Sequence, residues 1–312
     1  MNFLSRNKWT SEDISNLEGK KVIVTGANSG LGFEASKMFA ENNAHVVMAC
    51  RSLEKGRKAR KKIEEKVDEA SLEVRKIDLA SLKSVEDFAD EYKANNDSLD
   101  ILCNNAGVMA IPRSETKDGF EKQLGVNHLG HFALTGHLID LLLDTEGSRV
   151  VTQSSGLHEN GEIDFDDLMM EESYDKWEAY AQSKLANVLF GYELDRKLEN
   201  KEVKSVVCHP GYASTNLQYK GPQEEGSKIR LGLMKVANTL VAQSARKGAL
   251  PMMYASTSDE IEGGEYIGPG GLANMRGYPE KQESSDISYD KDVAKALWTR
   301  SEDLTSIDYD LD

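Results

Sequence analysis

The chain has 312 residues, of which 38 are lysine or arginine and 53 are aspartate or glutamate, so its formal net charge is -15. This balance argues against nonspecific nucleic-acid binding and against binding to anionic membranes, and it indicates either an ordinary acidic surface or adaptation to high salt. The apolar share of 39% is sufficient for a globular core. No linker, repeat or low-complexity tract divides the chain, so we expect one domain over residues 1–312.

The cysteines and the N-terminal segment favour a cytoplasmic protein. Cys50, Cys103 and Cys208 lie at or near the ends of apolar runs, without disulfide or zinc spacing, as buried reduced cysteines do. Residues 1–17 are expected to form a surface arm. The polar segment up to Lys20 has neither a signal-peptide core nor a membrane-spanning stretch, so no membrane anchor is expected.

The first strand leads into a glycine-rich turn. The apolar run Lys21–Thr25 precedes three glycines, and a helical pattern follows from Phe33 to about Asn43. A strand, a glycine-rich turn and a helix form the phosphate-binding unit of dinucleotide-binding folds, although the glycine spacing here is GxxxGxG. An ordinary βα turn is the alternative. The turn residues that we expect to contact a cofactor are Gly26, Asn28, Ser29, Gly30, Leu31 and Gly32.

The second strand, His45–Cys50, ends in Arg51. Folds that bind NAD usually place a carboxylate at this point to hold the ribose 2′-hydroxyl. An arginine suits a 2′-phosphate because of its charge and its planar set of donors. The sequence therefore favours NADP over NAD. A solvated Arg51 is the alternative, and it would leave the cofactor preference open.

Two further strand ends carry candidate cofactor contacts. A charged helix over 53–70 precedes the third strand, Leu72–Lys76, which is followed by Asp78 and Leu79. Asp78 is expected either to meet the adenine amino group or to cap the helix over 82–95. The fourth strand, Leu99–Cys103, leads into a run of small residues that permits close approach of a ligand. The contacts expected from that run are Asn105, Ala106 and Gly107.

Residues 118–143 are predicted to form one long helix. Asn127 lies in its middle, where asparagine is unfavourable, and this indicates a helix distortion or a buried polar role. His128 and His131 are three residues apart, but no third ligand is evident. We interpret them as packing or surface residues, and no metal is expected.

The fifth strand, Ser148–Gln153, ends in Ser154 and Ser155, and a polar loop follows over 156–176. The acidic run Asp164–Asp167 in this loop fits no calcium-loop spacing, so a solvated loop is favoured over a metal site. The sixth strand, Val203–Cys208, ends at Pro210 and Gly211. We expect a substrate lid over 212–243, a helix over 244–256, a last strand over 264–267, a helix over 290–302 and a frayed acidic tail over 303–312.

Tyr180 and Lys184 lie four residues apart in a predicted helix over Tyr180–Tyr192, and therefore on the same face. An ammonium group beside a phenol favours the phenolate, and lowering the phenol pKa by about 2 to 3 units requires roughly 3 to 4 kcal/mol. The pair alone is equally typical of a solvated helix face. Its context decides between the two interpretations.

The alternation of strands and helices predicts an α/β fold with a Rossmann-type, doubly wound parallel sheet of about seven strands flanked by helices. Ligands bind at the carboxyl ends of the strands in such sheets. The glycine-rich turn and the segments around Arg51, Asp78, Gly107, Ser155 and Gly211 all follow strands. Their convergence at one edge carries more weight than any single motif.

In this order, the motifs resemble those of the short-chain dehydrogenase/reductase family over about residues 18–302. The resemblance is closest to the retinol dehydrogenase-like branch, through Ala49–Arg51, Val126–Phe132, Phe165–Leu168 and Tyr180–Phe190. Membrane-bound members of that branch have an apolar N-terminal anchor, which is not found here. The strand before Ser155 is also more polar than usual.

The resemblance implies a role for each motif. Tyr180 would exchange a proton with the substrate oxygen, which Ser155 would hydrogen-bond. Lys184 would lower the Tyr180 pKa and hold the nicotinamide ribose, and Asn127 would keep the helix open for a water that relays protons to Lys184. The residues implied around the nicotinamide are Pro210, Gly211 and Thr215.

We therefore expect an NADP-dependent oxidoreductase that interconverts an alcohol and a carbonyl by hydride transfer, with Tyr180 as general acid and base. The apolar residues Leu231, Leu233, Met234 and Val236 of the expected lid favour a lipophilic small-molecule substrate. The alternatives are a reductase of conjugated C=C bonds and a non-catalytic NADP-binding regulatory protein on the same fold. A homodimer or homotetramer is also expected from the resemblance.

Overall fold

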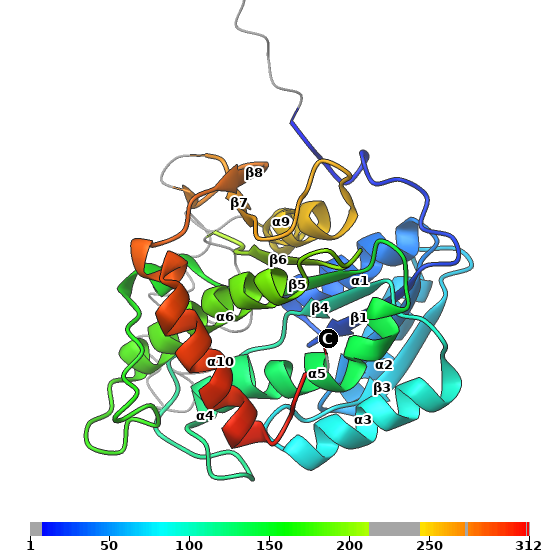
Figure 1. Ribbon diagram of the computed structural model, residues 1–312. Coiled ribbons are helices and arrows are strands. Elements are labelled where there is room, and N and C mark those ends of the chain that lie inside the picture. The colour runs from blue at the N-terminus through cyan, green and yellow to red at the C-terminus, as the bar shows by residue number, and fades with distance from the viewer. Residues whose placement is uncertain (1–7, 212–243, 272–273, 310, 312) are drawn as a thin grey trace, which may run out of the picture.

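The computed structural model describes residues 8–211, 244–271, 274–309 and 311. They contain one sheet of eight strands in the order β3-β2-β1-β4-β5-β6-β7-β8 (Figure 1). The strands are β1 (Lys21–Thr25), β2 (His45–Cys50), β3 (Leu72–Lys76), β4 (Ile101–Asn104), β5 (Arg149–Gln153), β6 (Lys204–Cys208), β7 (Tyr266–Pro269) and β8 (Pro279–Gln282). The doubly wound parallel sheet is confirmed for the first seven.

The eighth strand was not predicted. β8 pairs antiparallel with β7 and forms an edge of the sheet, with Gln282 opposite Tyr266. Its sequence, Pro-Glu-Lys-Gln, has no apolar run, and a proline is tolerated at the first residue of an edge strand. β7 itself begins two residues later than the predicted 264–267.

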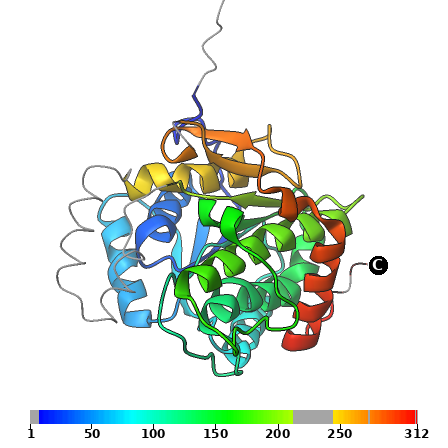
Figure 2. The ribbon, with the colours of Figure 1, turned by 90° about the vertical axis from the view of Figure 1, so that its left-hand side faces the viewer.

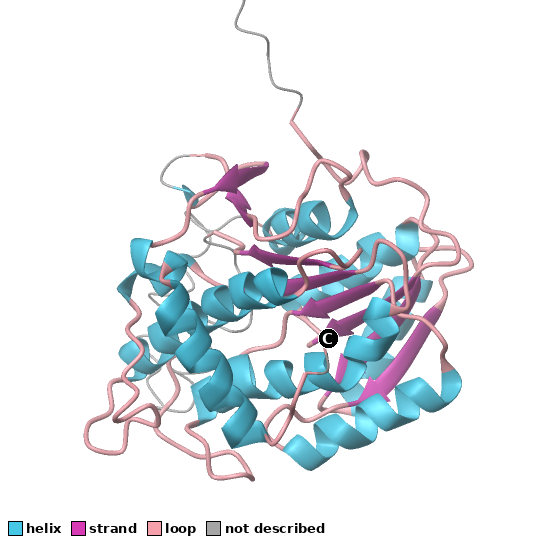
Figure 3. Cartoon of the chain, viewed as in Figure 1, coloured by secondary structure: helices cyan, strands magenta, loops and turns pink. Residues whose placement is uncertain are grey.

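Helices cover both faces of the sheet (Figures 1 to 3). The longer described helices are α1 (Gly30–Glu41), α2 (Leu53–Glu64), α3 (Leu82–Asn95), α5 (Gly130–Leu143), α6 (Lys176–Lys197), α9 (Ala245–Thr257) and α10 (Lys291–Thr305). One core lies under α1, α2 and α9, and contains Met38, Ile63 and Met253. The other lies under α3, α5 and α6, and contains Phe88, Phe132 and Phe190. None of the described helices is long and apolar enough to span a membrane.

The helix predicted over 118–143 begins later and is interrupted. It consists of α4 (Lys122–Leu124), the π-helical segment η1 (Gly125–Leu129) and α5. Asn127 lies in η1, so the predicted distortion is confirmed. A π-helical turn widens the backbone hydrogen-bond ladder locally and is frequent at functional sites. The helix predicted over 53–70 is shorter than expected, because α2 ends at Glu64.

Both chain ends pack more closely than predicted. In the N-terminal arm, Trp9 meets the ring of Tyr254 at 5.1 Å, and Ile14 and Leu17 are buried. At the other end α10 runs to Thr305, and Tyr309 is buried against Trp298. The expectation of a frayed tail over 303–312 is therefore wrong for residues 303–309, since aromatic burial outweighs the acidic composition of this segment.

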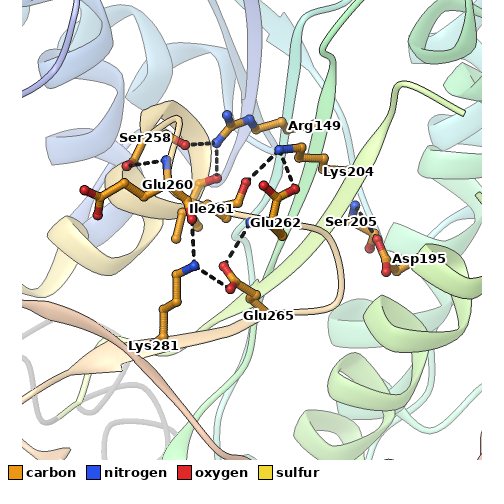
Figure 4. Close-up of polar contacts among 11 residues, drawn as sticks. Arg149, Asp195, Lys204, Ser205, Ser258, Glu260, Ile261, Glu262, Glu265 and Lys281 are labelled. Atoms are coloured by element: carbon orange, nitrogen blue, oxygen red, sulfur yellow. Dashed lines mark hydrogen bonds and ion pairs between the residues drawn. The ribbon is translucent and has the colours of Figure 1, made fainter. Parts of the chain in front are cut away.

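Polar contacts stabilise the sheet edge opposite the strand carboxyl ends (Figure 4). Arg149 at the start of β5 donates to the carbonyls of Ala255 and Ser258, at 3.0 and 2.8 Å, where α9 ends. Lys204 at the start of β6 donates to the Ile261 carbonyl at 2.8 Å. These bonds fix the α9–β7 connection to the amino ends of β5 and β6. The candidate site lies at the opposite, carboxyl ends of the strands.

Candidate active site

The glycine-rich turn after β1 has the shape of a phosphate site. Gly26 and Gly30 have φ values of +69° and +59°, which favour glycine. A Cβ at Gly32 would lie 2.6 Å from Asn105 Nδ2 and 2.7 Å from the Gly26 carbonyl, so no side chain fits there. Ser29 precedes α1, and its side chain caps no N–H of the first turn in the described part of the chain, so these N–H groups can donate to a ligand. The residues present fit the pyrophosphate of a dinucleotide.

Thr25 locks this turn to the segment after β4. Its hydroxyl oxygen accepts the N–H groups of Asn105 and Ala106, both at 2.9 Å. Asn105 Nδ2 donates back to the Thr25 carbonyl at 2.7 Å. The two segments that were predicted to hold a cofactor are therefore one rigid unit, and Gly107 follows directly.

Asn127 joins that unit to the Tyr180 helix. Its Oδ1 accepts from Val108 N at 2.8 Å, and its Nδ2 donates to the Val108 carbonyl and to Ser183 Oγ, at 3.0 and 2.9 Å. A Cβ at Gly107 would lie 3.0 Å from Asn127 Oδ1 and 3.7 Å from Lys184 Nζ. The bare backbone of Gly107 thus lies beside the lysine amine.

Asn127 has a further partner that the sequence analysis missed. His131 Nδ1–H donates to the Asn127 carbonyl at 2.9 Å, and its Nε2 lies 2.9 Å from Thr25 Oγ1. The ring therefore links the π-helical segment to the glycine-rich turn. His131 is buried, which agrees with the expected packing role, but its two hydrogen bonds were not predicted. Burial lowers the pKa of its imidazole to about 4.

Tyr180, Ser155 and Lys184 come together at the ends of β5 and α6. Burial raises the pKa of Tyr180 to about 12, and a hydrogen bond from the Ser155 side chain opposes this rise. The net lowering of the Tyr180 pKa that was expected from the sequence is wrong for this structure, because burial outweighs the groups that favour the phenolate. Lys184 Nζ lies 5.8 Å from the Tyr180 ring centroid and donates to the Gln153 carbonyl at 3.0 Å. Burial also lowers the pKa of Lys184, to about 8.

The two neighbouring serines have different partners. Ser154 Oγ donates to the Lys184 carbonyl at 2.8 Å and is buried, so it supports the α6 backbone. Ser155 Oγ accepts from Leu157 N at 3.2 Å and lies near the Tyr180 phenol. This geometry favours Ser155 as the serine that meets a substrate oxygen. The Gln153 carbonyl, a backbone atom without a sequence signal, is the further group that holds Lys184.

Arg51, Asp78 and Leu79 lie at the ends of β2 and β3. Arg51 is exposed, and the hydroxyl of Ser52 caps α2. Asp78 Oδ1 accepts from Ala80 N at 3.2 Å, whereas α3 is capped by Ser81, so the helix-cap alternative for Asp78 is wrong. Leu79 is buried, and its carbonyl would lie 2.6 Å from a Cβ at Gly130.

The β6 end carries the Pro210–Gly211 pair. Gly211 has a φ of +59°, and a Cβ there would lie 2.5 Å from the Met275 carbonyl, so the position requires glycine. Thr215, the predicted lid over 212–243 and the apolar residues within it lie outside the described residues.

Comparisons with known proteins identify the fold and its relatives. A family model described as short chain dehydrogenase matches residues 20–226. Retinol dehydrogenase 14 of Mus musculus is 38% identical over 303 residues, which cover 93% of this chain and 87% of that protein. A crystal structure of an uncharacterized protein from Mycobacterium paratuberculosis is 37% identical with a TM-score of 0.80, over 97% of this chain and 99% of that one.

A more distant structure shares the fold. It is a short-chain dehydrogenase from Shigella flexneri in complex with NADP, 21% identical with a TM-score of 0.61. The alignment covers 81% of this chain and 97% of that one.

Proposed function

Because the chain belongs to the short-chain dehydrogenase/reductase family, in its retinol dehydrogenase-like branch, we propose that it interconverts an alcohol and a carbonyl with NADP as its cofactor. Membership makes it an NAD(P)-dependent oxidoreductase that acts on the CH–OH/C=O pair. What we propose beyond this is the choice of NADP, the roles of Tyr180, Ser155 and Lys184, and a lipophilic substrate.

The observation that carries the mechanism is the hydrogen bond of Ser155 with the Tyr180 phenol, while Lys184 on the same helix lies beside the bare backbone of Gly107. When bound, the nicotinamide supplies or accepts the hydride. Tyr180 is a neutral phenol in the free protein, because burial raises its pKa to about 12. It therefore holds the proton that a developing alkoxide needs when a carbonyl is reduced, and Ser155 Oγ donates a second hydrogen bond to the same oxygen.

Lys184 and Asn127 support that proton transfer. Lys184 is held near Tyr180 by the Gln153 carbonyl, and at neutral pH it remains mostly charged with a pKa of about 8. Its positive charge favours transfer of the phenol proton. Asn127 fixes Val108 and Ser183, and so keeps the Gly107 backbone and α6 at a constant separation.

Arg51 supports NADP. It is exposed directly after β2, and the Gly26 N–H donates to the Ala49 carbonyl at 2.9 Å, which places the β2 end beside the glycine-rich turn. Residues 50–53 contain no carboxylate to hold a ribose 2′-hydroxyl. The exposed guanidinium offers a planar set of donors to a 2′-phosphate instead.

The names of the relatives support the proposed substrate class. Several curated relatives at about this identity are named retinol dehydrogenases, and one from Danio rerio, 37% identical, is named polyprenol dehydrogenase. Both names refer to long apolar alcohols. A lipophilic alcohol or its aldehyde is therefore the substrate that we propose, in agreement with the apolar residues of segment 212–243.

An absorbance assay of NADPH consumption tests the reaction. Lipophilic aldehydes should be reduced, and conjugated alkenes without a carbonyl should not. Tyr180→Phe removes only the phenolic oxygen, so turnover should be lost while NADPH still binds. Undiminished turnover in this variant would exclude Tyr180 as the proton donor, and consumption with alkenes alone would favour C=C reduction.

Cofactor choice is tested by titration of Arg51→Asp. This variant should bind NADPH at least about tenfold more weakly and NADH nearly unchanged, because one charge-assisted contact is worth about 1.5 to 3 kcal/mol. Arg57→Asp is a matched control, since Arg57 is an exposed arginine on α2. An equal loss in both variants would assign the effect to net charge alone.

A further inference from the structure

Two buried histidines, His158 and His209, contact the ring of Tyr266 at the carboxyl edge of the sheet. The ring centroid of each imidazole lies 5.2 Å from that of Tyr266. His209 is stacked on the phenol with an interplanar angle of 7°, and His158 is tilted by 57°. All three side chains are at most 4% exposed. None of them was singled out in the sequence as part of the site.

His158 holds the backbone of Ser155. Its Nδ1 lies 2.8 Å from the Ser155 carbonyl, and its Nε2 accepts the N–H of Ser285 at 3.1 Å. A backbone N–H only donates and a carbonyl only accepts, so the ring must carry its proton on Nδ1. The Tyr266 hydroxyl lies 3.2 Å from the same Nδ1. His158 therefore ties Ser155 to the segment that follows β8.

His209 holds the backbone of Gly211 with the opposite tautomer. The Gly211 N–H donates to His209 Nδ1 at 3.3 Å, so the proton lies on Nε2, which donates to Gln282 Oε1 at 2.9 Å. Gln282 Nε2 in turn donates to the Pro269 carbonyl at 3.0 Å. A Cβ at Gly268 would overlap the imidazole, so β7 is shaped to accept this ring.

We propose that His158 and His209 are positioning residues of the reaction, the first for Ser155 and the second for the Pro210–Gly211 segment, and that Tyr266 couples them. The inference rests on the proposed function for the catalytic meaning of these two segments. Both histidines must be neutral to accept their backbone N–H. Burial favours this state, because it lowers the pKa of His158 and lowers that of His209 to about 4.

The β7–β8 hairpin supplies partners for both histidines. It supplies Tyr266 and Gln282, and Ser285 lies three residues after the end of β8. The antiparallel edge strand thus braces two segments that come from β5 and β6. An imidazole that is hydrogen-bonded at both nitrogens restrains the position of its backbone partner, and misplacement of a reacting group by about 1 Å can cost about 100-fold in rate.

Histidine ¹⁵N NMR of the free protein tests the geometry without any turnover. At pH 7.5, His158 should show a protonated Nδ1 and His209 a protonated Nε2. The reverse tautomer at either ring, or a doubly protonated ring, would overturn the inference. This measurement remains informative if every candidate substrate fails, whereas such a failure would count against the proposed function alone.

Variant kinetics test the positioning role. His158→Phe keeps an aromatic ring but removes both hydrogen bonds, so kcat should fall about 10- to 100-fold while the KM for NADPH changes less than about threefold. His158→Gln has an amide that can donate and accept, and it should recover most of this loss. His209→Phe should instead weaken NADPH binding, measured by fluorescence titration without substrate.

The controls separate positioning from general destabilisation. His137→Phe makes the same change at a partly buried α5 residue outside this cluster, and it should leave both parameters unchanged. Thermal unfolding reports whether each variant is folded. Folded His158→Phe and His209→Phe variants with wild-type kcat and wild-type NADPH affinity would overturn the inference. If these variants do not fold, the kinetics of His158→Gln and the tautomers seen by NMR test the positioning role instead.

Discussion

His128 makes a sharp prediction about stability. It lies in η1, is 1% exposed and sits among Phe132 and Phe190, with ring centroids 6.1 and 6.0 Å away. Its Nε2 lies 2.8 Å from Ser301 Oγ on α10, and its Nδ1 has no hydrogen-bond partner among the residues that the structure describes. Burial lowers its pKa from 6.5 to about 3. The folded state therefore disfavours the protonated ring.

The size of the effect follows from linkage. Because the folded pKa lies below the unfolded one, the stabilising contribution is complete above pH 6.5 and is lost as the pH falls from 6.5 toward 3. At pH 5 the His128 ring remains neutral in the folded protein. In the unfolded chain the ring is protonated, because pH 5 lies about 1.5 units below its unfolded pKa of 6.5. At about 1.36 kcal/mol per unit, the loss is about 2 kcal/mol.

The perturbation is His128→Leu, which removes the titrating group and keeps a side chain of similar volume. The free energy of unfolding would be measured in urea at pH 7.5 and pH 5.0 for wild type and variant. When the pH is lowered from 7.5 to 5.0, the free energy of unfolding of the variant should fall by about 2 kcal/mol less than that of wild type. This difference does not depend on how stable the variant is at pH 7.5.

Ser301→Ala is the matched control. It removes the hydroxyl partner of His128 but keeps the imidazole, so its difference from wild type should depend little on pH. A constant difference between His128→Leu and wild type at both pH values would refute the reasoning, because it would mean that His128 titrates alike in the folded and unfolded states.

Three further outcomes follow from the geometry. Gly32→Ala should weaken NADPH binding at least about tenfold, measured by fluorescence titration, because its methyl group would press on Asn105 and Gly26, and normal affinity would contradict the packing. Lys184 in the free protein should lose its proton near pH 8 in an NMR titration, and a value near 10.5 would show that it is solvated. Tyr309→Phe should cost about 1 kcal/mol in urea unfolding, since Tyr309 Oη donates to the Phe132 carbonyl at 2.6 Å, and no change would mean that this bond contributes nothing net.

Most of the parallel strands could be predicted because they contain short apolar runs that are buried, although β3 is a mixed edge strand that is only partly buried. β1, β2 and β3 match their predicted ranges residue for residue. β8 has no such run, since it is an edge strand held by backbone pairing to β7. The ordered packing of residues 303–309 was also not predicted. The burial of Tyr309 depends on contacts with Phe132 and Trp298, which are distant in sequence and leave no local pattern.

The site was predictable in its placement but not in its electrostatics. Parallel strands bring their carboxyl ends to one edge, so the meeting of Gly107, Ser155 and Tyr180 could be expected from chain order. The direction of the Tyr180 pKa shift could not, since it depends on burial and on the Gln153 carbonyl that holds Lys184. The contact between His158 and Tyr266 joins residues 108 apart, and no local pattern indicates it.

The C-terminal helix has a consequence for the helix that carries Tyr180. α10 crosses in front of α6 in Figure 1, and Leu297 and Trp298 pack against the Tyr180 helix through Leu189 and Phe190. Every residue of α6 from Ala179 to Leu194 is buried in this structure. Part of that burial comes from α10, so the helix that carries Tyr180 and Lys184 is held in place by a segment more than 100 residues further along the chain.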